Sequence, residues 1–406
     1  MTAPKVDTTY LTEQLKLLVR SPEAIVDDGD DAQRSELQRL TRQASIALET
    51  SQESMQRVMF SHLPLVTTRL SNSFGIFAPL AKASLANPVP LEELVKASGL
   101  NRPLVRSIMD YNVYHGAAVE PQQYFYAPTK LTHSLLDPKS DVTTTCWHEL
   151  VGPAYGKLHQ LLKHGAGAGK RTAFQVAHDT TETFYDFLES RPEKHSIFYG
   201  YMAANHSVTA KWTNVVRFDE ELAAGAKKDE TVFVDIGGGD GGQSIEAQKV
   251  HKLGGKIVLQ DRSAVIAKAA KAREAGIETM DYDFFTEQPI KGARVYFIQF
   301  VLLNWDDEAV VKILSSQVPA MGPDSLLVIV DFVQCHRWVN LKEDGSPQEP
   351  DLWTPSTAIA AYSCHESKGR AREDYGALLE RAGLELKETR IYTGAGQGVM
   401  IAKKKL

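Results

Sequence analysis

Apolar residues recur every three or four positions through most of the N-terminal part of the chain. The pattern is clear in LTEQLKLLV at 11–19 and in LQRLTRQASIALETSQESMQRVM at 37–59. It predicts an N-terminal helical extension over residues 1–65. The acidic stretch DDGDDAQRSE at 27–36 interrupts the pattern and predicts an exposed linker.

Residues 66–140 have a different pattern. A helix, a short helix and a further helix are followed by two β-prone pieces, around Val119 and at 124–127. This is the order of a winged helix. The second and third helices carry few Lys or Arg side chains to meet phosphates, so we expect dimerisation or a lid rather than DNA binding.

Residues 141–220 predict a helical linker that forms a lid over a substrate. Its helices are expected at roughly 141–165 and 181–217. The sequence GAGAGK at 165–170 lies between them without a preceding strand, which indicates a flexible loop rather than a phosphate cradle.

Residues 221–406 alternate between apolar β-prone runs and helical patterns. The runs TVFVDIG, KIVLQD, ARVYFIQFVLL and SLLVIVDFV are continuous and apolar, as in a parallel sheet that is buried on both faces. The final stretch KETRIYTGAGQGVMIAKKK predicts an antiparallel hairpin about GAGQG. The fold class is therefore α/β, a doubly wound Rossmann-like sheet with a C-terminal hairpin, preceded by the helical and winged-helix-like parts.

Composition excludes some functions. A net charge of −6 over 406 residues argues against a nucleic-acid partner. No apolar run approaches the roughly 20 residues that span a bilayer, and the N-terminus lacks a signal-peptide pattern, so no membrane partner and a cytoplasmic location are expected. The three cysteines are widely spaced, which indicates free thiols, and no metal site is predicted.

The glycine-rich turn VFVDIGGGDGG at 232–242 follows the first of the apolar runs. Glycines there permit a tight turn and a close approach of the backbone to a ligand, although a plain strand-to-helix turn is the alternative. Asp235 precedes the glycines and would repel a pyrophosphate but attract a cationic amino-acid group. Asp261 ends the next run, where a carboxylate can accept both hydroxyls of a ribose.

These motifs carry a resemblance. DIGGGDGG, the QD that ends the second run, MDYDFFTEQP, NWDDE and VPAMGPDSLLVIVDFV match in order the class I S-adenosylmethionine-dependent O-methyltransferases. The chain resembles most the two-domain caffeate type and its fungal secondary-metabolism branch. The resemblance implies S-adenosylmethionine as cofactor, a small-molecule substrate and a homodimer formed through the winged-helix region.

The resemblance also implies the residues that hold the cofactor. The loop of Gly237, Gly238 and Gly239, with Asp235, would hold the methionyl part, and Asp261 the ribose. The remaining predicted cofactor residues are Asp283 and Phe284 beside the adenine, Trp305 on its other side, and Gln299, which stands where the family has a lysine.

One catalytic position departs from the family. Caffeate-type enzymes have a His-Asp-Trp-x-Asp stretch whose His is the general base, and this chain has Leu303 and Asn304 before the tryptophan. Leucine cannot accept a proton. A Glu that helps to hold that His in the family is matched by Gly369, while the other supporting acid falls near Asp331.

These departures leave three functions open. The first is an enzyme that uses bound S-adenosylmethionine as a fixed positive charge and catalyses a dehydration, cyclisation or pericyclic reaction of a polyketide or alkaloid intermediate. It resembles the pericyclases built on the O-methyltransferase fold. The second is a conventional O-methyltransferase whose base lies elsewhere or whose substrate needs none, and the third is a non-catalytic scaffold.

The candidate substrate residues come from three distant segments. Apolar Leu303 would suit an apolar substrate, and Asn304 could orient a carbonyl. His148 and His365 could act on the substrate together with Asp331, although a structural histidine and a solvated loop at 363–368 are the alternatives. The remaining candidates for the substrate wall are Trp147, Tyr201, Met202, Asn205 and His206.

Overall fold

The computed structural model describes residues 7–20, 31–163, 171–208, 211–223, 227, 229–334, 352–393 and 396–405. The chain divides into two compact units, Met1–Val66 and Thr67–Leu406. The finer division into a winged-helix region, a lid and a cofactor domain stays a prediction.

The N-terminal unit is helical, as predicted. Its helices are α1 (Thr8–Arg20), α2 (Asp31–Leu48) and α3 (Ser51–Met59). Asp31–Glu36 belong to α2, so the linker expected at 27–36 is shorter than predicted. Helices α1 and α3 bury none of their residues, and their expected role in a homodimer stays a prediction.

The second unit begins with helices and a small antiparallel sheet. Its first elements are α4 (Leu63–Ser73, which begins in the first unit), α5 (Phe77–Leu80), β1 (Val89–Pro90), α6 (Leu91–Ser98), α7 (Arg102–Tyr114), β2 (Ala118–Gln122) and β3 (Phe125–Pro128). The sheet has the order β1-β3-β2. The helix order and the two β pieces thus match the sequence prediction.

A helical segment follows. It contains α8 (Lys130–Leu136), α9 (Pro138–Cys146), the π-helix η2 (Trp147–Val151), α10 (Gly152–Lys163), α11 (Ala173–Ala177), α12 (Phe184–Glu189), α13 (Pro192–Val208), η3 (Trp212–Asn214) and η4 (Phe218–Leu222). The single helix expected at 181–217 is wrong: Pro192, which cannot continue a helix from its interior, begins a new one. The loop expected at 165–170 lies outside the described residues.

The large sheet has the order β10-β11-β8-β7-β4-β5-β6, and β9 pairs with β8. Its strands are β4 (Thr231–Ile236), β5 (Lys256–Asp261), β6 (Glu278–Asp281), β7 (Val295–Gln299), β8 (Leu326–Gln334), β9 (Arg370–Ala371), β10 (Leu384–Ile391) and β11 (Gln397–Lys404). The pairs among β4 to β8 are parallel, and β11 pairs antiparallel with β8 and β10. This confirms the predicted α/β fold and hairpin, whose tip at 394–395 lies outside the described residues.

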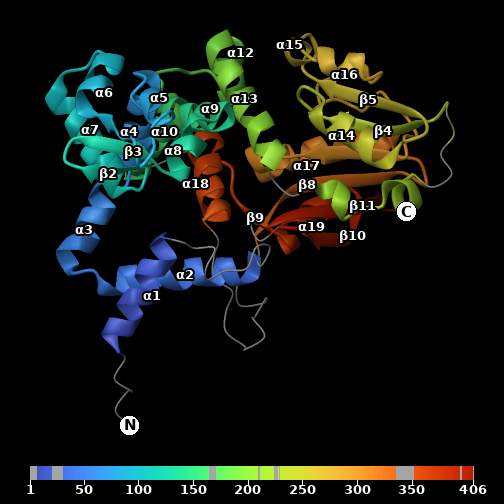
Figure 1. Cartoon of the computed structure of the whole chain (residues 1–406). Coiled ribbons are helices and arrows are strands. Elements are labelled where there is room, and N and C mark those ends of the chain that lie inside the picture. The colour runs from blue at the N-terminus through green and yellow to red at the C-terminus, as the bar shows by residue number, and fades with distance from the viewer. Residues whose placement is uncertain are drawn as a thin grey trace. The chain divides into compact units, whose positions relative to one another are not determined.

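Helices cover both faces of this sheet (Figure 1). Those packed on it include α14 (Gly242–His251), α16 (Ala270–Glu274), α17 (Asp307–Gln317) and α19 (Arg372–Arg381), and the other helices of this part are α15 (Ser263–Ile266), η5 (Leu302–Asn304), η6 (Val318–Ala320) and α18 (Trp353–His365). Helix α18 packs against α10 and α11 instead. Side chains alternate along each strand: Val234 joins the core with α17 and α19, whereas Phe233 joins the core with η3 and α14. Burial on both faces explains why the strands are continuous apolar runs.

Candidate active site

A cavity of about 810 Å³ opens at the carboxyl ends of β4, β5 and β7. Its other walls come from α12, α13 and α18. Open α/β sheets bind ligands at this edge because the loops that follow the strands converge there. Of the predicted site residues, the cavity is lined by Trp147, Tyr201, Met202, Asn205, Asp235, Gly237, Gly238, Gly239, Asp261, Asp283, Phe284, Gln299, Leu303, Asn304, Trp305 and His365.

The glycine loop cannot carry side chains. A Cβ on Gly238 would lie 2.5 Å from the carboxyl carbon of Asp235, and Gly239 has a φ of +64°, which L side chains rarely adopt. A Cβ on Gly237 would lie 2.9 Å from Val301. The loop therefore needs glycine at these positions to keep its backbone at the edge of the cavity.

Within the described part of the chain, two buried oxygen acceptors in the cavity wall have no hydrogen-bond donor. They are Oδ1 of Asp235 and Oε1 of Gln299. The other carboxylate oxygen of Asp235 accepts a hydrogen bond from Ser244 Oγ at 2.7 Å. Buried acceptors are normally paired, so these two atoms indicate a ligand that brings its own donors.

Burial is the main reason that the pKa of Asp235 is raised to about 7, and the nearby Asp261 adds to it, whereas the hydrogen bond from Ser244 opposes it. An ammonium group beside Asp235 would offset this cost by favouring the ionised form.

The carboxylate of Asp261 is oriented by the backbone. It accepts hydrogen bonds from the N–H of Gly239 at 2.8 Å and of Arg262 at 2.7 Å. Burial raises the pKa of Asp261, while these two hydrogen bonds oppose the shift. Carboxylate oxygens have further lone pairs, so Asp261 can still accept from ligand hydroxyls.

Aromatic rings form the wall beside Asp283. The Trp305 indole lies edge-on to Phe284, with centroids 5.9 Å apart, and to Phe285, with centroids 4.8 Å apart. The Asp283 carboxylate accepts a hydrogen bond from the Phe285 N–H at 3.0 Å. This gives an apolar aromatic wall with an acceptor beside it, which suits a purine with an exocyclic amine.

These features fit S-adenosylmethionine. Asp235 and Gln299 would face its ammonium group, the glycine loop its methionyl backbone, and Asp261 its ribose. Asp283, Phe284 and Trp305 would enclose its adenine. The orphaned acceptor of Asp235 also speaks against a dinucleotide pyrophosphate at this position.

The raised pKa of Asp235 predicts a pH dependence of cofactor affinity. The ionised carboxylate binds an ammonium group, and this form is lost as the pH falls through about 7. We expect the affinity for S-adenosylmethionine to fall about fivefold from pH 7 to pH 6. Calorimetric titration checks this, and Asp235→Asn should bind weakly with a flat profile; an unchanged slope in that variant would contradict the assignment.

The turn that carries Leu303 and Asn304 is held through its backbone. Oδ2 of Asp331 accepts a hydrogen bond from the Leu303 N–H at 3.1 Å. The Leu303 carbonyl accepts one from the hydroxyl of Ser367. The Leu303 side chain is thus free to line the cavity, and Asp331 is engaged with the backbone instead of with a catalytic side chain.

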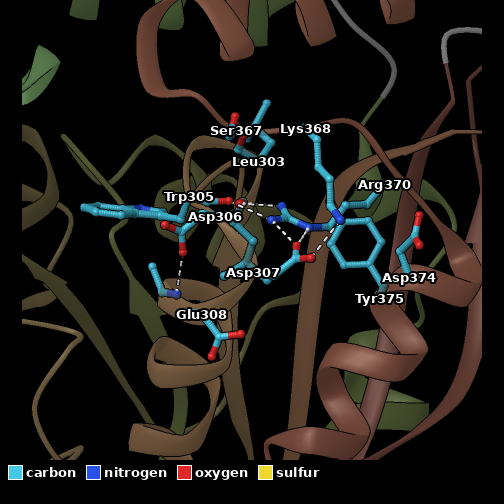
Figure 2. A network of polar contacts seen from close by, with 12 residues as sticks. Leu303, Trp305, Asp306, Asp307, Glu308, Ser367, Lys368, Arg370, Asp374 and Tyr375 are labelled. Atoms are coloured by element: carbon cyan, nitrogen blue, oxygen red, sulfur yellow. Dashed lines mark hydrogen bonds and ion pairs between the residues drawn. The ribbon is translucent and has the colours of Figure 1, made fainter. Parts of the chain in front are cut away.

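Arg370 holds the same turn from the other side (Figure 2). Its buried guanidinium donates to the carbonyl of Leu302 at 3.0 Å and to that of Trp305 at 2.7 Å. It also forms an ion pair with Asp307 at 2.9 Å. Lys368 joins from outside with a second ion pair to Asp307 at 2.7 Å. This network fixes the residues on both sides of Asn304.

The space for the family's supporting Glu is filled. A Cβ on Gly369 would lie 2.0 Å from Nε2 of Gln334. The Gln334 side chain therefore occupies the space into which a residue at 369 would point. Behind Leu303 only a cavity of about 20 Å³ remains in this part of the described structure. The family's general base and its supporting Glu are thus both missing here, and the space for that Glu is taken by Gln334.

The structure separates the proposed catalytic residues. His365 lines the cavity, and burial lowers its pKa to about 4, so its imidazole is neutral at pH 7. Asp331 is buried behind Leu303 and does not line the cavity, and burial raises its pKa to about 7. His148 lies in η2 away from the cavity lining, because its side chain leaves the helix on another side than Trp147.

The proposed substrate wall is largely brought together. Trp147, Tyr201, Met202 and Asn205 line the cavity, and the rings of Trp147 and Tyr201 meet edge-on with centroids 6.3 Å apart. The side chain of His206 lies outside the described residues.

Sequence reasoning missed several residues that line the cavity. Tyr185 and Tyr199 come from α12 and α13, and His195 stacks on Tyr199 with centroids 4.3 Å apart. Arg262 forms ion pairs with Asp186 at 2.9 Å and Glu189 at 2.8 Å. The position of Arg262 directly after Asp261 was the available signal, whereas no motif marks the tyrosines.

The described part of the chain contains no cluster of His, Cys, Asp and Glu that could hold a metal ion. Within the same residues, no helix has the length and apolar character needed to cross a membrane.

Cys146 and Cys364 are buried free thiols, as predicted, and Cys335 lies outside the described residues.

Comparison with known proteins places this site in a family. The family model of the O-methyltransferase domain matches residues 155–385. A demethylsterigmatocystin 6-O-methyltransferase of Aspergillus parasiticus is 26% identical over 381 residues, which cover 93% of this chain and 94% of the relative.

Two solved structures are similar over 98% of this chain and 100% of their own chains. LepI in complex with SAM has a TM-score of 0.82 and 25% identity. A pericyclic reaction enzyme has the same TM-score of 0.82 and the same 25% identity. From the extent of the family match, the chain belongs to the O-methyltransferase family.

Proposed function

We propose that this protein binds S-adenosylmethionine and catalyses a dehydration, cyclisation or pericyclic reaction of a polyketide or alkaloid intermediate without transferring the methyl group. The observation that carries the proposal is the side chain of Leu303, which lines the cavity where caffeate-type relatives have their general base. Methylation of a neutral hydroxyl is assisted by a proton acceptor, and leucine is not one.

The surroundings of Leu303 support the same conclusion. Asp331, which could orient a histidine, accepts from the Leu303 backbone instead. Gln334 fills the space next to Gly369 where a second acid would be needed. The residues that fit the cofactor are present in this chain, whereas the general base of the caffeate-type relatives and its supporting Glu are missing. The similarity to LepI and to a pericyclic reaction enzyme adds support.

The cofactor supplies a fixed sulfonium charge when it is bound. Asp235 and Asp261 would hold it in one orientation at the sheet edge, and Trp147, Tyr201 and Met202 would form a largely apolar wall opposite. A shaped wall selects one reactive conformer of a flexible substrate, and a positive charge near a carbonyl stabilises developing negative charge. Such a site needs no proton acceptor at position 303.

Replacing the cofactor tests the role of the charge. The substrate pool would be the metabolites that accumulate in a strain lacking the protein. Protein stripped of cofactor should regain conversion with S-adenosylmethionine, and S-adenosylhomocysteine, which lacks the charge, should restore about a hundredfold less. Equal restoration by both, at concentrations that saturate the protein, would contradict the role of the sulfonium.

A conventional O-methyltransferase is the second candidate. His365 favours it, because a neutral imidazole in the cavity wall can accept a proton. Its low pKa of about 4 makes it a weak base, so this function suits a substrate whose hydroxyl is already acidic.

A further inference from the structure

Tyr185 and Asn304 form a hydrogen-bonded pair in the cavity wall. They are 119 positions apart in the sequence, and Nδ2 of Asn304 lies 2.9 Å from the Tyr185 hydroxyl. The same nitrogen lies 3.2 Å from the carbonyl oxygen of Phe300. A carbonyl oxygen can only accept, so the atom facing it must be the amide nitrogen. The carbonyl thus fixes the orientation of the Asn304 amide.

This orientation determines what the Tyr185 hydroxyl can do. Its oxygen already accepts the amide hydrogen, so its own hydrogen must go to another acceptor. Among the described residues, none is placed to accept it, although the side chain lines the cavity. Burial raises the pKa of this phenol far above neutral pH, so the group keeps its proton. His365 stacks on the ring at 5.6 Å and limits its movement.

The residue at position 304 sets the direction of this hydrogen bond. The His-Asp-Trp-x-Asp stretch of the caffeate-type family has an Asp there, and a carboxylate facing a phenol would take the phenol's hydrogen. The amide of Asn304 does the reverse and leaves that hydrogen for a ligand. With Asn instead of Asp at position 304, the Tyr185 hydroxyl hydrogen is therefore available to a ligand instead of being bound by a carboxylate.

We propose that Tyr185 donates a hydrogen bond to a carbonyl or enol oxygen of the substrate, and that Asn304 is the positioning residue that keeps this donor available. The step involves no bond breaking by Tyr185: the phenol stabilises negative charge that develops on the substrate oxygen. The substrate chemistry rests on the proposed function, whereas the donor itself follows from the geometry of the pair.

Two probe ligands with the same ring system test the donor. 2-Acetylnaphthalene carries a carbonyl group, and 2-ethylnaphthalene does not. Their affinities for protein saturated with S-adenosylmethionine are measured by calorimetry, and the carbonyl stretch of the bound ketone is measured by infrared difference spectroscopy. The variants are Tyr185→Phe, which deletes the donor, and Asn304→Asp, which should capture it. The control is Tyr155→Phe, because the Tyr155 hydroxyl donates to the Ser356 carbonyl at 3.2 Å.

The wild-type protein should prefer the ketone and lower its stretching frequency. Tyr185→Phe and Asn304→Asp should each reduce this preference about two- to tenfold and shift the stretch back, with the affinity for 2-ethylnaphthalene unchanged. Tyr155→Phe should behave like the wild type. A wild-type protein without preference for the ketone, or an unchanged stretch in Tyr185→Phe, would overturn the proposal. Methyl transfer to a product would refute the proposed function but leave this result intact.

Discussion

Arg370→Ala is expected to lower the free energy of unfolding by about 3 kcal/mol. The Arg370 side chain is fully buried, and its removal takes the donor from the Trp305 carbonyl and leaves the Leu302 carbonyl with the Trp305 N–H at 3.2 Å alone. Asp307 contributes less to the loss, because it is 32% exposed and keeps its ion pair with Lys368. Unfolding in urea, followed by tryptophan fluorescence, measures the change.

The matched control is Arg372→Ala, two residues further along the chain, where the side chain is exposed. It should change the free energy of unfolding by less than about 0.5 kcal/mol. Arg370→Ala should also weaken cofactor binding, because Trp305 belongs to the same turn. Equal stability of the two variants would show that the network in Figure 2 does not hold the turn.

Restoring the base should create methyl transfer. Leu303→His alone puts an imidazole on the turn whose backbone Asp331 holds, but the family's second support is missing because Gln334 occupies the space beside Gly369. The combination of Leu303→His, Gln334→Ala and Gly369→Glu removes that obstacle. General-base catalysis typically contributes about 10²–10⁴-fold, so the triple variant should transfer labelled methyl groups to simple phenols at least a hundredfold faster than the wild type.

The control for this gain is the same combination with Leu303→Gln. Glutamine is polar and can reach the cavity but does not accept a proton at neutral pH. It should give no more transfer than the wild-type protein. Equal transfer by the His and Gln combinations would mean that position 303 does not limit the chemistry.

Much of the fold could be predicted from the sequence, since burial imposes periodic patterns on the chain. The runs around Val234 and Ile329 lie in the sheet with both faces covered, and this produces their continuous apolar character. The edge strand Glu278–Asp281 was not predicted, because it is short and only partly buried. The break in the helix expected at 181–217 was missed although Pro192 and the polar stretch ESRPEKHS at 189–196 mark it.

The cofactor side of the site was more predictable than the substrate side. Asp235, the glycine loop and Asp261 lie at strand ends in adjacent segments, so the sheet topology alone brings them together. Tyr185 and Asn304 meet only because α12 packs over the strand ends, and His148 turns away from the cavity within a π-helix. Such contacts depend on tertiary packing, for which the chain carries no local pattern.

The fate of the cofactor's methyl group tests the central claim most directly. Wild-type protein is incubated with methyl-labelled S-adenosylmethionine and the metabolites that accumulate in a strain lacking the protein, and products are analysed by mass spectrometry. We predict a product that forms only when the cofactor is bound, that carries no label, and that leaves the labelled cofactor intact. Labelled methyl in the product, formed in proportion to S-adenosylhomocysteine, would contradict the claim and establish a methyltransferase.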